Sequence, residues 1–495
     1  MLDPVARRPA LIAVLFVGLM TAWRLAVLAV DAPYLSFDEA QYWAWAQSLE
    51  LGYYSKPPMV AWVIAATTAA CGDGPGCVKL GAAIAHAGTA GVLYFLGRHL
   101  YGPRIGAWAA MSWSVVPAVS LSSVMITTDP FLLFFWALAL LFLVRAADAG
   151  PGSNRWWLAL GLAFGLGMLS KYAMILFAAS VALWLAWSPG RRSLAKAPGL
   201  WLAAATGLAV YAPNALWNAA NGFVSYAHTK DNANLGGDLF HFGKLAEFVA
   251  GQFGVFGPIA MAALVVALVA VLRRPPQDPG ERDGVRLLAA FTLPVLMLMT
   301  VESFLSRANA NWSAPAFVAG TVLATAFLAR RAPRLLAASL ALHVAAAGLL
   351  YNLDAARAAL GVADTARYDI EKRVRGWQEV GARVSEILAA HPGARLMADE
   401  RKVMATLIYA VRPHPFDAVK WNPDGDVRDH YDQTTRIEPG EKQLILVTEQ
   451  PTLPAEMRDA FARAEKIEDI VIPIHRDYER RVAVWRLEDF RGYAR

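Results

Sequence analysis

About eleven apolar stretches fill roughly the first 350 residues of this chain of 495 residues. A helix needs about 20 predominantly apolar residues to cross the hydrocarbon core of a bilayer, and most of these stretches approach that length. We therefore expect a polytopic α-helical membrane domain over residues 1–354. Its spans are placed near residues 10–30, 78–98, 105–126, 130–145, 156–169, 172–188, 198–215, 248–272, 286–304, 312–329 and 334–352.

Charged residues are scarce and unevenly distributed. They make up 17% of the chain, whereas an ordinary soluble domain has about 25%. The segment 355–495 is rich in Arg, Asp and Glu. It contains a helical stretch at 368–390 and β-like runs at 395–398, 444–447, 470–473 and 482–485. Helices and strands mixed over this length predict a small soluble α/β domain at 355–495.

Arginines in the short loops indicate which side of the membrane each loop faces, because cytoplasmic loops carry an excess of Lys and Arg. If Arg7 and Arg8 lie inside, so do the pairs Arg191–Arg192 and Arg330–Arg331. The C-terminal domain then faces outward. We expect a bacterial inner-membrane protein with a periplasmic C-terminal domain. The net charge of +6 is accounted for by these loops and does not indicate a nucleic-acid partner.

The outward segment 34–76 is too long for a turn and too polar at its start to cross the membrane. Its aromatic residues suit interfacial helices at headgroup depth, so we assign it to the membrane domain. Cys71 and Cys77, the two cysteines of the chain, lie at its end. In an oxidising periplasm they can form a disulfide; two free thiols are the alternative.

The acidic pair Asp38–Glu39 stands in the first loop after the first span. A carboxylate at the membrane surface can accept a proton from an acceptor group. The alternative is structural, because Asp caps helices well and Glu is favoured in a first turn. Asp129, before Pro130 at the outer end of a later span, offers another carboxylate with the same alternative.

Three cations also face outward. Lys56 precedes two prolines that begin a helix, where an ammonium beside backbone amides suits a phosphate; a snorkelling lysine is the alternative. Lys171 interrupts a long apolar run, and a charge there is costly unless it is paired or bound. Arg307 is the third cation. Carboxylates and cations on one face predict transfer of a group from a lipid phosphate.

The ordered motifs resemble a known family. They read DEAQYW from Asp38, GYYSKPP from Gly52, TTDP from Thr127, LSKY from Leu169 and RANANWSAP from Arg307. Together they are similar to the GT-C glycosyltransferases of the protein O-mannosyltransferase superfamily. Within that superfamily they resemble the bacterial branch that includes the aminoarabinose transferase of lipid A, ArnT. The resemblance covers about residues 10–330.

The resemblance implies inverting transfer of one sugar from a polyprenyl (undecaprenyl) phosphate donor at the periplasmic face. It makes Asp38 the catalytic carboxylate, with Glu39 beside it and Asp129 in support. It places Lys56, Lys171 and Arg307, with Tyr42 and Tyr54, around the donor phosphate. It implies no metal and no other cofactor. The acceptor is an envelope lipid such as lipid A, a glycan or a protein, and we expect a monomer.

Two other functions are considered. A transporter or flippase of polyprenyl-linked glycans should show internal repeats or broken helices with charges near the midplane. We see no such repeat in the sequence, and the charges cluster at one face. Oligosaccharide transfer to protein predicts a metal-binding carboxylate pair and a larger recognition domain. The sequence specifies neither the sugar nor the acceptor.

Overall fold

The computed structural model describes residues 8–149, 154–233 and 239–493, so Arg7 lies outside the described residues. The chain forms two compact units. The first comprises Met1–Asp31, Lys56–Val63 and Lys79–Leu353, and the second comprises Ala32–Ser55, Ile64–Val78 and Asp354–Arg495. Each unit is described separately.

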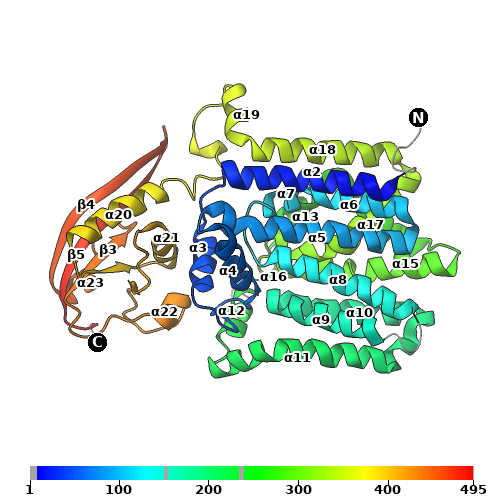
Figure 1. Cartoon of the computed structure of the whole chain (residues 1–495), viewed down its shortest axis with the longest axis horizontal. Helices are drawn as coiled ribbons and strands as arrows, with labels where there is room; N and C mark the ends of the chain where they lie inside the picture. Colours follow the sequence, from blue (N-terminus) through cyan, green and yellow to red (C-terminus); the bar gives the residue numbers. More distant parts are fainter. Residues whose placement is uncertain (1–7, 150–153, 234–238, 494–495) are drawn as a thin grey trace. The chain divides into compact units, whose positions relative to one another are not determined.

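The first unit is helical (Figure 1). Its elements are α2 (Pro9–Val30), α5 (Pro75–Tyr101), α6 (Pro103–Val115), α7 (Pro117–Ser122), α8 (Asp129–Asp148), α9 (Asn154–Ser170), η1 (Tyr172–Ile175), α10 (Leu176–Trp187), η2 (Pro189–Lys196), α11 (Pro198–Ala220), α12 (Val224–Ala233), α13 (Phe242–Phe256), α14 (Pro258–Arg273), α15 (Pro279–Ala290), α16 (Leu293–Leu305), η3 (Ala310–Ser313), α17 (Ala314–Arg331) and α18 (Pro333–Tyr351). The first residues of α5 belong to the second unit, as does part of α4 (Met59–Cys71).

Six helices among the described residues are long and apolar enough to cross a membrane by themselves. They are Pro9–Val30, Pro75–Tyr101, Asp129–Asp148, Pro279–Leu305, Ala310–Arg331 and Pro333–Tyr351. The pair α13 and α14 passes the same test jointly but is bent by 110°. The polytopic helical class is confirmed, whereas the number of eleven spans stays a prediction.

Prolines and glycines break several of the apolar stretches. The stretch expected at 105–126 is divided into α6 and α7, because Pro117 has no N–H to continue the helix. At the bend between α13 and α14, Gly257 has φ +91°, and a Cβ on it would lie 1.8 Å from Nε2 of His343. Only glycine fits there without displacing the histidine.

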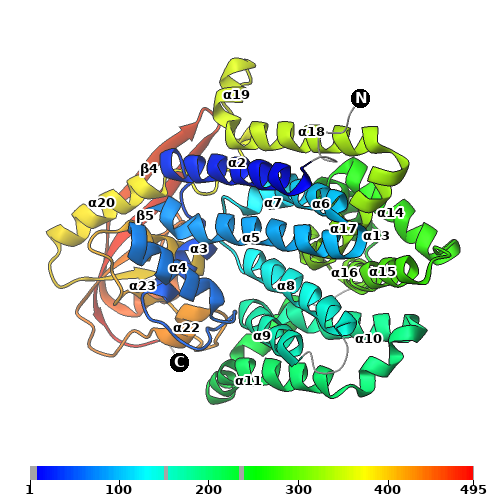
Figure 2. The same cartoon turned by 45° about the vertical axis from the view of Figure 1, so that its right-hand side comes forward.

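A buried arginine, Arg24, hydrogen-bonds to the backbone next to the break between α6 and α7. Arg24 on α2 is almost fully buried and donates from Nε to the hydroxyl of Tyr351 at 3.0 Å. It also donates to the backbone carbonyl of Ser114 near the end of α6. Figures 1 and 2 show α2 and α18, which carry Arg24 and Tyr351, running side by side. The guanidinium thereby satisfies backbone that water cannot reach.

The second unit is built on a mixed five-stranded sheet of order β2-β1-β3-β5-β4. Its strands are β1 (Arg395–Ala398), β2 (Val419–Lys420), β3 (Gln443–Thr448), β4 (Phe461–His475) and β5 (Tyr478–Phe490). The pairs β1–β2 and β1–β3 are parallel, and β5 is antiparallel to β3 and β4. Its other elements are α3 (Phe37–Ala46), α19 (Leu353–Ala359), η4 (Ala366–Tyr368), α20 (Trp377–Ala390), α21 (Arg401–Ala410), α22 (His430–Thr434) and α23 (Ala455–Asp459).

The four β-like runs all lie within strands of this sheet, and α20 covers the second half of the predicted helix 368–390. The α/β class of the C-terminal region is therefore confirmed. The strands are recognisable from sequence because runs such as Leu444–Val447 are continuous, apolar and partly β-branched, which is typical of buried strands.

The grouping of the loop 34–76 differs from the sequence-based assignment. Residues 32–55 and 64–78 belong to the second unit, although we expected 34–76 to belong to the membrane domain. The ring of Trp43 packs at 5.0 Å from Tyr409 and 4.5 Å from His414, and the Tyr409 hydroxyl donates to the carbonyl of Asp73 at 2.8 Å. The Trp43 ring is therefore buried within the second unit. In this loop Cys71 and Cys77 are joined by a disulfide.

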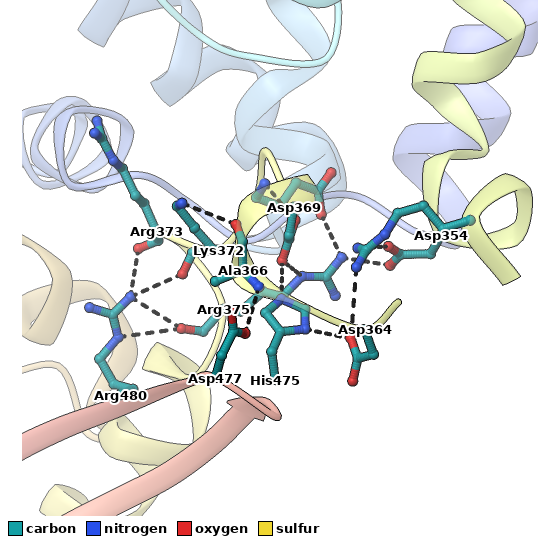
Figure 3. Close-up of polar contacts among 12 residues, drawn as sticks. Asp354, Asp364, Ala366, Asp369, Lys372, Arg373, Arg375, His475, Asp477 and Arg480 are labelled. Atoms are coloured by element: carbon teal, nitrogen blue, oxygen red, sulfur yellow. Dashed lines mark hydrogen bonds and ion pairs between the residues drawn. The ribbon is translucent and has the colours of Figure 1, made fainter. Parts of the chain in front are cut away.

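An ionic cluster ties the segment after α19 to the β4–β5 turn (Figure 3). His475 Nδ1 lies 2.6 Å from Asp364 Oδ1, and its Nε2 lies 2.8 Å from Asp369 Oδ2. Arg375 pairs with Asp369 at 2.9 Å and with Asp354 at 2.5 Å. Burial alone would lower the pKa of His475, but the hydrogen bonds to Asp369 and Asp364 raise it above its ordinary value of 6.5. These two hydrogen bonds thus stabilise the imidazolium form.

This cluster predicts pH-dependent stability. Because the folded pKa of His475 is raised, its contribution is complete below about pH 6.5 and is lost as the pH rises through the folded value. When the pH is raised, we expect the thermal midpoint of the full-length protein in detergent to fall by about 2 °C more than that of the His475→Gln variant. Differential scanning fluorimetry from about pH 6 to about pH 9 measures this difference. Parallel curves for the two proteins would contradict the assignment.

Candidate active site

The start of α3 separates the two members of the acidic pair. The Ser36 hydroxyl accepts from the Glu39 amide at 3.4 Å, and the Glu39 carboxylate accepts from the Ser36 amide at 2.9 Å. This is a reciprocal capping box, which satisfies backbone donors at a helix start. Glu39 is only 2% exposed. The structural alternative, a helix cap, therefore describes Glu39, and its catalytic role stays a prediction.

Asp38 points to a different partner. Its side chain is 48% exposed, and its Oδ1 lies 2.6 Å from Nη2 of Arg401, whose side chain is 27% exposed. Arg401 is the first residue of α21, and its guanidinium lies 4.9 Å from the centre of the Phe37 ring. Asp38 is thus a reachable carboxylate held by one arginine within the second unit.

Arg401 was not among the residues that we selected from the sequence. It is 363 positions from Asp38, and no motif spacing connects residues so far apart. The sequence signal was limited to the run Ala398–Arg401, which looks like any charged helix start.

The tyrosines expected at the donor phosphate pack among aromatic rings of the second unit. Tyr42 is buried with its ring 5.3 Å from Trp45, which stacks on Tyr53 at 4.6 Å. The Tyr54 hydroxyl donates to the carbonyl of Val427 at 3.3 Å. These contacts fix the loop after α3. Phosphate binding by Tyr42 and Tyr54 stays a prediction.

In the first unit the structure brings together two of the predicted residues. Lys171 Nζ donates to Asp129 Oδ1 at 2.6 Å, and the side chains are 24% and 13% exposed. Asn311 of η3 donates to the other oxygen, Oδ2, at 3.0 Å. Asp129 opens α8, and Lys171 stands between α9 and η1. Three places where helices begin or end therefore supply the residues of one charged cluster.

A polar network next to Lys171 escaped the sequence analysis. The Tyr172 hydroxyl lies 3.3 Å from Asn214 Oδ1 and accepts from Asn218 Nδ2 at 3.2 Å. Both asparagines are fully buried on α11. Two asparagines four residues apart on an apolar helix were the available signal, because that spacing places both on one helix face.

The remaining cations differ in setting. Lys56 is partly exposed just before α4, and Arg307 is exposed between α16 and η3. No ion pair joins Arg307 to Asp129 among the described residues. No group of three or more His, Cys, Asp or Glu that could hold a metal is present in the described part of the chain. Convergence of all these residues on one pocket stays a prediction.

Comparison with known sequences gives consistent matches. A family model described as dolichyl-phosphate-mannose-protein mannosyltransferase matches residues 55–217. The lipid A galacturonosyltransferase RgtD of Rhizobium johnstonii is 34% identical over 421 residues, covering 83% of this chain and 85% of the relative. An undecaprenyl phosphate-alpha-4-amino-4-deoxy-L-arabinose arabinosyl transferase of Pseudomonas aeruginosa is 32% identical over 132 residues, covering 26% of this chain and 24% of that relative.

Comparison with solved structures gives the same architecture. ArnT from Cupriavidus metallidurans bound to undecaprenyl phosphate aligns with a TM-score of 0.60 at 17% identity, over 95% of this chain and 98% of that chain. At this identity the likeness concerns the fold. The predicted GT-C type membrane domain with a C-terminal α/β region is confirmed.

The pair of Lys171 and Asp129 predicts a non-additive response to mutation. Lys171→Met leaves a largely buried carboxylate with Asn311 as its one remaining donor among the contacts described above, so we expect it to cost about 2 kcal/mol. Asp129→Asn in the same chain removes the stranded charge and should restore most of that loss. A double-mutant cycle of thermal unfolding in detergent measures the coupling. Additive losses would show that the ion pair contributes no coupling.

Proposed function

Because this chain belongs to the ArnT-like bacterial branch of the GT-C glycosyltransferases, we propose that it transfers galacturonic acid from a polyprenyl-phosphate carrier to lipid A. The chain is a membrane glycosyltransferase that uses a polyprenyl-phosphate sugar. The relative that covers most of the chain is named for galacturonic acid and lipid A, which supports this sugar and this acceptor. We place the reaction at the periplasmic face of the inner membrane.

The proposed step is a single displacement. An acceptor hydroxyl oxygen attacks the anomeric carbon, the bond from that carbon to the phosphate oxygen breaks, and the phosphate leaves with the electron pair. The hydroxyl proton passes to a carboxylate, and the anomeric configuration inverts. We assign Asp38 as this base, because a general base must be within reach of the proton that it accepts.

The carrier phosphate gains one negative charge as it leaves. Fixed cations lower the energy of that developing charge. We assign this role to Lys56 and Lys171, with Arg307, Tyr42 and Tyr54 as further contacts to the donor. In this proposal Asp129 and Asn311 orient the Lys171 ammonium. Asp129 accepts a hydrogen bond from Lys171 at Oδ1, and Asn311 holds the other oxygen, Oδ2.

One observation carries the assignment of the base. Of the two adjacent carboxylates, Glu39 is buried in a capping box, whereas Asp38 is half-exposed. The relatives described above are transferases, which favours an enzyme over a transporter.

The test replaces Asp38 with Asn in purified full-length protein. We expect transfer from polyprenyl-phosphate galacturonic acid to lipid A to fall by about 100- to 10,000-fold, because a general base is lost. Binding of the donor should persist. Mass spectrometry of lipid A measures transfer, and calorimetry with the donor measures binding.

Glu39→Gln is the matched control, because Gln also completes a capping box. This variant should keep far more transfer than Asp38→Asn. A larger loss in Glu39→Gln than in Asp38→Asn would place the base at Glu39. Full activity in Asp38→Asn would remove the carboxylate from the mechanism.

A further inference from the structure

Arg401 has hydrogen-bonding capacity that Asp38 does not use. The guanidinium carries five N–H donors in a planar fork. One nitrogen, Nη2, donates to Asp38, and within the described residues neither Nε nor Nη1 of Arg401 makes a hydrogen bond. Phe37 covers one face of the fork. The Arg401 side chain is 27% exposed, and a carboxylate can bind bidentately to an edge that Nη2 forms with Nε or with Nη1.

The surroundings of Arg401 also contain buried polar atoms without partners. In the described part of the chain they are the Tyr431 hydroxyl, His430 Nδ1 and both side-chain heteroatoms of Gln41. Gln41 follows Asp38 by three residues on α3, so the two share one helix face. Arg401 exerts an electrostatic influence on both His430 and Tyr431. Unpaired buried polar atoms cost free energy unless a ligand or water satisfies them.

Arg401 supplies a permanent cation beside Asp38, because an arginine cannot lose its proton in a protein. Burial lowers the pKa of His430 to about 4, so this histidine is neutral at physiological pH. Asp38 offsets the charge of Arg401, so selection of a carboxylate rests on the N–H donors of the guanidinium that Asp38 leaves free.

We infer that Arg401 is a specificity-determining residue that binds the carboxylate of the transferred uronic acid, while its contact with Asp38 orients the base. This inference rests on the proposed function, because it names the group by which that function's sugar is selected. Nη2 carries two N–H bonds, so it can donate one to Asp38 and the other, together with Nε or Nη1, to the sugar carboxylate. The second unit thereby supplies both the base and the selector.

The test compares two donors in the full-length enzyme. They are polyprenyl-phosphate galacturonic acid and polyprenyl-phosphate galactose, which differ by a carboxylate against a hydroxymethyl group. We expect Arg401→Gln to lower kcat/KM for the uronic donor by about 10- to 100-fold, through KM, because a charge-assisted bidentate contact is lost. Use of the galactose donor should fall less, because that donor loses only the orientation of Asp38. Arg401→Lys, which keeps the charge without the fork, should fall between the two.

Arg383→Gln is the matched control, because Arg383 pairs with Glu468 on the sheet and not with Asp38. It should leave the preference between donors unchanged. An equal loss of kcat for both donors in Arg401→Gln would limit Arg401 to positioning Asp38 and overturn the inference. The thermal midpoint of each variant shows whether a loss of activity comes from misfolding. If Arg401→Gln is misfolded, the donor preference of Arg401→Lys tests the inference.

A second acceptor distinguishes the source of the bound anion. If lipid A stripped of its phosphates abolishes the effect of Arg401→Gln, the arginine binds an acceptor phosphate and the assignment to the sugar is wrong. If the effect persists with that acceptor, the sugar carboxylate is supported. A wild-type enzyme that turns over neither donor refutes the proposed function, and this inference with it.

Discussion

Backbone hydrogen bonding in a bilayer dominates this structure. Within hydrocarbon every N–H and C=O needs a partner in the protein, so the chain crosses as helices, and irregular backbone is confined to positions buried in protein or near water. The candidate residues obey this constraint. Asp129 opens α8, Lys171 precedes η1 and Asn311 lies in η3. Polar chemistry is therefore concentrated where helices begin.

The same principle operates in the second unit. Asp38 is in the first turn of α3, and Arg401 is the first residue of α21. At the start of α3 the capping box occupies Glu39, which leaves its neighbour half-exposed. Two adjacent carboxylates thus acquire different tasks from one helix start. The division follows from local geometry, because a capping box engages only the third helical residue.

Much of the fold was predictable from local patterns in the sequence. The continuous apolar runs of the sheet and the long spans were recognisable because each depends on neighbouring residues. The pairing of Lys171 with Asp129 was accessible too, since an isolated charge in an apolar run requires a partner. The role of Arg401 was not predictable from the sequence, because it depends on α21 packing against α3. These two helices are separated in the chain by the whole membrane domain. The membership of Trp43 in the second unit was missed for the same reason.

The composition of the second unit affects its biogenesis. Helix α3 leaves the ribosome early, whereas Arg401, its ionic partner, is synthesised 363 residues later. At ordinary translation rates the delay is about 20 to 70 s. Throughout that interval the residues that cover Trp43 in the folded protein, such as Tyr409 and His414, have not been synthesised. The newly made loop therefore stays uncovered until the C-terminal region of the polypeptide has been synthesised.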